Sequence, residues 1–159
     1  MKVLWVGNNQ RFLSDTQKLL KKKGHDVQAI SKGSEVSRIL SVQNIHVVIL
    51  DVKMPDITGI EALKKIKRHF PMVQVIMLSR HGTAACAVRS LKFGAADYLF
   101  NPVTIEKLLQ KVDEALEKRA CLEKKIRDIQ IRVLEWQFKE IDSHNNDSMN
   151  QCFGRLSRP

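Results

Sequence analysis

The chain has 159 residues, of which 43% are hydrophobic and 28% charged, with a formal net charge of +10. These values are typical of one globular domain with an appended segment. The apolar runs are too short to span a membrane. The chain opens on a strand pattern rather than a signal peptide, and its three cysteines are scattered, so we expect a cytoplasmic protein with free thiols.

Short apolar runs alternate with amphipathic segments along the first 120 residues. The apolar runs predict buried strands at 3–6, 27–30, 47–50, 73–79 and 97–101. The segments between them predict helices, one of which ends at Gly24, while Ser34 and Thr104 are expected to begin two others. Five strands, each followed by a helix, predict an α/β fold with a doubly wound, five-stranded parallel sheet.

In such a sheet, the loops that follow the strands gather at one edge, where the functional site lies. The residues expected there are 7–9, Asp51, 79–80 and Asn101. The first loop is unusual because it reads Gly-Asn-Asn and contains no carboxylate.

Three stretches carry a resemblance to a known family: "DVKMPDITGIEAL", "VIMLSRHG" and "LKFGAADYLFNPV". In order and spacing they resemble the receiver domain of bacterial two-component response regulators, over about residues 1–120. The resemblance implies a flavodoxin-like fold that takes a phosphoryl group from a histidine kinase onto an aspartate. It also implies that this aspartate and two acids after the first strand hold Mg²⁺.

Several family positions are matched in this sequence. Asp51 lies at the phosphoacceptor position and Ser79 at the position of the hydroxyl that binds the phosphoryl oxygen. Tyr98 lies at the position of the aromatic residue that switches rotamer in the family. The alternative for Tyr98 is a strand tyrosine that only packs in the core.

Other family positions are not matched. The acid pair falls on Gly7 and Asn8, and the phosphate-binding lysine falls on Asn101. Because Mg²⁺ is usually held by carboxylates, and phosphoryl transfer depends on metal and cation charge, we expect weak or absent Mg²⁺ binding and little phosphotransfer. The resemblance is therefore to a degenerate receiver, or pseudo-receiver, with no metal site and no enzymatic activity.

Two basic residues lie close to Asp51 in this arrangement. Lys53 follows it by two residues, and Arg80 follows Ser79. We hypothesise that one of them forms an ion pair with Asp51 and occupies the place of a metal. The alternative is that both side chains point into solvent.

The last predicted helix continues beyond the receiver-like residues 1–120 without a break. A heptad counted from Ile105 has apolar residues at most a and d positions, interrupted at Arg119. Residues 121–142 are thus a helical extension that favours a parallel coiled coil and a homodimer. A second apolar line, Ile131, Leu134, Phe138 and Ile141, predicts more than one neighbour: a helical bundle, another protein, or the receiver itself. Residues 143–159 are polar and predict a disordered tail.

Together these features predict a response-regulator-like signalling protein without a separate output domain. It would act through protein contacts, independently of phosphorylation, with a histidine kinase or another signalling protein as partner. One alternative is a stand-alone receiver still phosphorylated at Asp51. A second is a basic nucleic-acid-binding module, which the positive charge favours, but no helix-turn-helix follows the receiver and aromatic residues are few.

Overall fold

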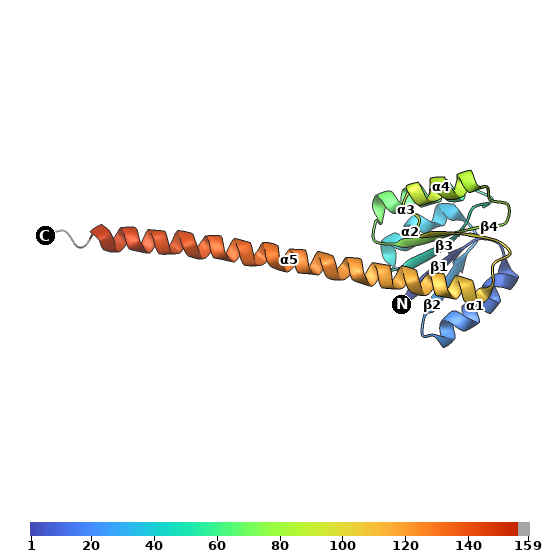
Figure 1. The fold of residues 1–159 in the computed structure, drawn as a ribbon, viewed down its shortest axis with the longest axis horizontal. Helices are drawn as coiled ribbons and strands as arrows, with labels where there is room; N and C mark the ends of the chain where they lie inside the picture. Colours follow the sequence, from blue (N-terminus) through green and yellow to red (C-terminus); the bar gives the residue numbers. More distant parts are fainter. Residues whose placement is uncertain (156–159) are drawn as a thin grey trace. The chain divides into compact units, whose positions relative to one another are not determined.

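The computed structural model describes the backbone of residues 1–155 and the side chains of residues 1–9 and 12–143. The chain divides into two compact units, the first spanning Met1–Ala120 and the second beginning at Cys121. The first unit contains a five-stranded parallel sheet in the order β2-β1-β3-β4-β5 (Figure 1). Its strands are β1 (Lys2–Val6), β2 (Asp26–Ile30), β3 (Val47–Asp51), β4 (Gln74–Ser79) and β5 (Asp97–Phe100). The predicted doubly wound α/β fold is confirmed.

Two hydrophobic cores lie on opposite faces of this sheet, because successive strand residues point to opposite sides. Val48 and Leu50 pack under one set of helices, α2 (Val36–Val42), α3 (Gly59–His69) and α4 (Ala84–Lys92). Val47 and Ile49 pack under α1 (Gln10–Lys22) and the early part of α5 (Ile105–Arg155). Burial on both faces explains the continuous apolar runs of the strands. Within the described part of the chain, no helix is long and apolar enough to cross a bilayer.

The helix beginnings agree only in part with the sequence. Thr104 caps α5 as expected, because its Oγ1 accepts a hydrogen bond from the Lys107 N–H at 3.3 Å. Ser34 was expected to cap a helix, but it lies inside a short 3₁₀ turn, η1 (Gly33–Glu35), and α2 begins after it. The cap comes from a distant loop instead: the Asp56 carboxylate accepts hydrogen bonds from the backbone N–H groups of Gly33 and Ser34 at 3.1 and 2.9 Å. Hydrogen bonds from Ser34 and Gly33 hold the pKa of Asp56 well below its ordinary value.

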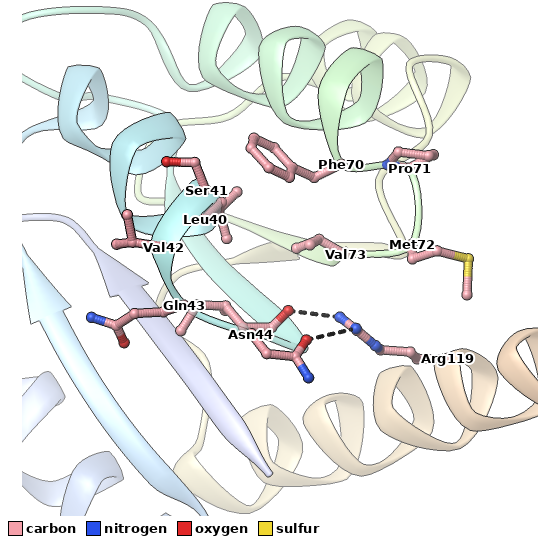
Figure 2. A pocket seen from close by; sticks show the side chains of 11 residues that line it. Leu40, Ser41, Val42, Gln43, Asn44, Phe70, Pro71, Met72, Val73 and Arg119 are labelled. Atoms are coloured by element: carbon pink, nitrogen blue, oxygen red, sulfur yellow. Dashed lines mark hydrogen bonds between the residues drawn. The ribbon is translucent and has the colours of Figure 1, made fainter.

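Arg119 interrupts the apolar heptad because its side chain is bonded inside the first unit, to which it belongs, and does not face a partner helix. Its side chain is only 8% exposed, and its guanidinium donates to the Ile45 carbonyl at 2.6 Å and to Asn44 Oδ1 at 3.1 Å. Figure 2 shows these bonds among the residues that line a cavity of about 410 Å³. This end of the sheet lies opposite Asp51, since it is formed by the loops that precede β3 and β4.

The second unit is helical from Cys121 to Arg155 as the last part of α5. The sequence predicts a disordered tail from residue 143, whereas the backbone stays helical to Arg155; residues 156–159 lie outside the described residues. No proline occurs between Pro102 and Pro159, and polarity alone does not end a helix.

Candidate functional site

A cavity of about 350 Å³ opens where β1, β3 and β4 end. The side chains that line it are Asn8, Asn9, Asp51, Lys53, Arg80 and His81. The sequence correctly brings Asn8, Asp51 and Arg80 to one edge from three separate strands. The sequence analysis did not include His81 among the site residues. Its position directly after Arg80, in the loop after β4, could have indicated it.

Asp51 is the last residue of β3 and is half-buried. Its Oδ1 accepts a hydrogen bond from the backbone N–H of Lys53 at 3.1 Å, so its own loop helps to hold it. The end of β1 passes very close: a Cβ atom placed on Gly7 would lie 2.9 Å from Cβ of Asp51. Gly7 also has a φ of +156°. A side chain at position 7 would therefore require β1 and β3 to move apart.

The donors around Asp51 do not fit a magnesium site. Among the described residues that line the cavity, Asp51 supplies one carboxylate and Asn8 and Asn9 supply neutral amides, while the remaining three are basic. No group of three or more His, Cys, Asp or Glu suited to a metal occurs in the described part of the chain. Mg²⁺ needs hard, preferably anionic oxygen ligands, and nearby cations oppose its binding.

The predicted internal ion pair is not formed. Lys53 and Arg80 both line the cavity with Asp51. Among the described side chains, however, neither makes an ion pair with its carboxylate. Both cations are exposed and remain solvated by water, which offsets the gain from an exposed ion pair. The hypothesis that one of them takes the place of a metal is therefore wrong for this structure.

Ser79, Tyr98 and Asn101 do not line the cavity. Ser79 is buried at the end of β4, and its carbonyl accepts a hydrogen bond from the Asn101 N–H at 2.6 Å. Tyr98 points inward, is 7% exposed, and packs edge-on against Phe100 with ring centroids 5.1 Å apart. Its hydroxyl is buried and has no hydrogen-bond partner among the described residues.

Removing that hydroxyl should not destabilise the fold. A buried hydroxyl without a partner carries a desolvation cost of about 1–3 kcal/mol. We therefore expect Tyr98→Phe to leave the free energy of unfolding unchanged or to raise it by about 1 kcal/mol, measured by urea denaturation. A loss of more than about 1 kcal/mol would mean that the hydroxyl has a partner in solution.

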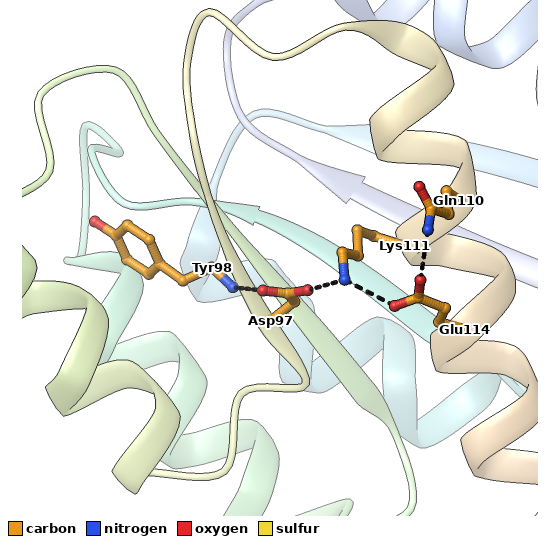
Figure 3. Close-up of polar contacts among 5 residues, drawn as sticks. All are labelled: Asp97, Tyr98, Gln110, Lys111 and Glu114. Carbon is orange, nitrogen blue, oxygen red and sulfur yellow. Dashed lines mark hydrogen bonds and ion pairs between the residues drawn. The ribbon is translucent and has the colours of Figure 1, made fainter.

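A network of ionic contacts ties β5 to α5 beside Tyr98, as Figure 3 shows. Lys111 Nζ lies 3.0 Å from Asp97 Oδ2 and 2.8 Å from Glu114 Oε2. Asp97 Oδ1 also accepts a hydrogen bond from the Tyr98 N–H at 2.7 Å. The contacts with Glu114 and then Asp97 raise the pKa of Lys111. The strand that carries Tyr98 is thus held to the helix on the far side of the sheet.

Relatives of known classification share this fold and this sequence pattern. The family model described as response regulator receiver domain matches residues 3–113. The "Putative response regulator NtrX-like" of Rickettsia typhi is 32% identical over 122 residues, which are 73% of this chain and 25% of that protein. "Regulatory protein AtoC" of Escherichia coli is 28% identical over 91% of this chain and 31% of that protein. The chain thus spans about a quarter to a third of the length of these curated relatives.

Solved structures agree with the sequence relatives. The CheY-like receiver domain protein of Methanospirillum hungatei has a TM-score of 0.70 at 27% identity, covering 75% of this chain and 95% of that chain. The receiver domain protein of Clostridium thermocellum has a TM-score of 0.70 at 33% identity, covering 76% and 98%. With its sheet order, its Asp51 at the end of β3 and the matched residues 3–113, this chain belongs to the response regulator receiver domain family of two-component systems.

Proposed function

We propose that this receiver signals without phosphorylation of Asp51 and acts through protein contacts. The observation that carries the proposal is the composition of the cavity around Asp51. Its described lining has one carboxylate, two amides and three basic side chains, and position 7 has no room for a second acid. Receiver domains of two-component systems engage protein partners such as kinases, so loss of phosphotransfer leaves a scaffold for contacts.

The chemistry of phosphoryl transfer supports this proposal. The transferred group carries charge on three oxygens, which a metal ion and a positioned cation must offset. Asn101 stands where the family has a lysine, and it does not line the cavity. Lys53 and Arg80 bring positive charge to the cavity, but a cation there also repels the metal that would have to bind.

The second part of the proposal concerns residues 121–142. Eight of their large apolar side chains are exposed in the single chain, among them Trp136 at 60% and Phe138 at 67%. An exposed apolar surface of this kind marks an interaction site. We propose that copies of the chain associate through this helix, and that a histidine kinase or another signalling protein is a further partner.

Intact mass after incubation with Mg²⁺ and acetyl phosphate tests the first part. We expect no phosphate-sized gain in mass, because the cavity around Asp51 lacks the ligands that would hold the metal and the transferred phosphoryl group while acetate leaves. A competent receiver treated in parallel should gain mass, and Asp51→Asn should behave like the unmodified chain.

One result would return the protein to phosphorelay signalling. If the chain gains mass and Asp51→Asn does not, then the site works despite its ligands. The stand-alone phosphorylated receiver would then be the better account of the protein.

A further inference from the structure

The helix of the second unit carries two separate apolar stripes. The first seam is defined here as Ile126, Ile129, Val133 and Trp136, and the second seam as Ile131, Leu134, Phe138 and Ile141. All eight side chains are exposed, Trp136 at 60% and Phe138 at 67%. At about 100° per residue, the centres of the two seams lie about 140° apart around the helix. A single partner helix therefore cannot cover both.

A row of like charges flanks each seam on the wide side between them. The basic row, Lys125, Arg132 and Lys139, borders the first seam. The acidic row, Asp128, Glu135 and Asp142, borders the second seam. The narrow side between the seams carries the neutral residues Gln130 and Gln137. On the wide side, the first seam is thus flanked by positive charge and the second by negative charge. On the narrow side, both seams are flanked by the same uncharged residues.

We propose that the first seam of one copy packs in parallel against the second seam of the next copy. Both seams have the same spacing of three, four and three residues, so a shift of five residues brings all four layers into register. The layers then place Ile126 on Ile131, Ile129 on Leu134, Val133 on Phe138 and Trp136 on Ile141. The smaller Val133 meets the larger Phe138 and the larger Trp136 meets the smaller Ile141, while the other two layers pair residues of equal size, so no layer stacks two bulky rings.

The same shift pairs the charges. In a parallel coiled coil, the residue before each a layer of one helix lies beside the residue five places further on in the other. With the five-residue shift, Lys125 of one copy lies beside Glu135 of the next, and Arg132 lies beside Asp142. On the other flank, Gln130 of one copy lies beside Gln130 of the next copy. The basic row makes no ion pair among the described residues of the single chain. In the proposed contact it meets an acidic row of the next copy.

Pairing of like seams is poorer by comparison. Two first seams in parallel place Trp136 against Trp136 and the basic row against glutamines, and they leave the second seam in water. Two second seams leave the first seam in water and the acidic row without a cation. Only the unlike pairing covers both apolar surfaces and pairs members of the two rows with each other, Lys125 with Glu135 and Arg132 with Asp142. Because each added copy presents a free seam, the contact is heterologous and does not stop at two copies.

This inference rests on the proposed self-association of the helix and adds its geometry. The test uses the full chain and two variants, Trp136→Gln in the first seam and Phe138→Gln in the second. Sedimentation should show the unmodified chain growing beyond a dimer as its concentration rises. Each variant alone should be monomeric, and an equimolar mixture should form a one-to-one dimer, because each supplies the seam that the other lacks. Lys124→Gln, outside both seams, should assemble like the unmodified chain.

A charge exchange makes a second, independent test. Arg132→Asp should weaken assembly by about tenfold or more, because it faces Asp142 of the next copy. Adding Asp142→Arg in the same chain should restore assembly, since the pair then re-forms with its signs reversed.

The outcomes separate this inference from the function on which it rests. If Phe138→Gln remains a dimer like the unmodified chain, and mixing produces no new species, the contact is a symmetric first-seam dimer: the inference is overturned and the self-association stands. If the unmodified chain is monomeric at every concentration, both are overturned. Neither result bears on Asp51, which the mass measurement tests separately.

Discussion

Arg119→Ala should lower the free energy of unfolding of the first unit by about 2–4 kcal/mol. The Arg119 side chain is 8% exposed, and its guanidinium satisfies the carbonyl of Ile45, a residue that is itself only 2% exposed. Removing the donor leaves that carbonyl unpaired in the interior, and it also removes the bond to Asn44. The truncation further opens the cavity of about 410 Å³ that Arg119 borders. Urea denaturation should show a lower midpoint at an unchanged slope.

Two further substitutions separate the hydrogen bonds from the packing of the side chain. Arg119→Met keeps the apolar stem but loses both bonds, and we expect it to recover only the part of the loss that comes from packing. Arg119→Lys keeps a positive donor but lacks the planar guanidinium that reaches two acceptors. Its free energy of unfolding should therefore lie between those of Arg119→Met and the unmodified chain. If the free energy of unfolding of Arg119→Ala lies within about 0.5 kcal/mol of that of the unmodified chain, the contacts with Ile45 and Asn44 contribute nothing to stability.

Arg119 also shows how far a heptad count can be trusted. The sequence correctly marked this residue as a break in the apolar seam, but it could not show why the break is there. The acceptors lie 74 and 75 residues earlier in the chain, at Ile45 and Asn44. Such a contact depends on how the loop before β3 meets α5, and local periodicity contains no information about it.

The sheet was predictable for the opposite reason. Burial on both faces leaves a continuous apolar run such as Val47–Leu50, which is visible without any tertiary knowledge. The strand ends then brought Asn8, Asp51 and Arg80 to one cavity. The side-chain contacts inside that cavity were not predictable. Lys53 and Arg80 were placed near Asp51 correctly, yet an ion pair depends on rotamer and solvation, which spacing does not determine.

Gly82→Ala should displace Tyr98 from its buried position. A Cβ atom placed on Gly82 would overlap the Tyr98 hydroxyl and would lie 2.8 Å from Ser79 Oγ. Overpacking of this kind typically costs about 1–3 kcal/mol, so we expect a loss of about 2 kcal/mol in the free energy of unfolding. Tyr98 is the only tyrosine in the chain, so the NMR signals of a ring-labelled sample report directly whether the ring has moved.

The double variant identifies the cause of that loss. The overlap is with the hydroxyl, which Tyr98→Phe removes, so this substitution should recover more than half of the loss in the Gly82→Ala chain. Since Tyr98→Phe alone is expected to be nearly neutral, the coupling between the two positions should exceed about 1 kcal/mol. Additive effects would show that Gly82→Ala acts on the loop itself. The inward position of Tyr98 would then be independent of Gly82, and a rotamer switch at Tyr98 would have to be driven from the side of Phe100 instead.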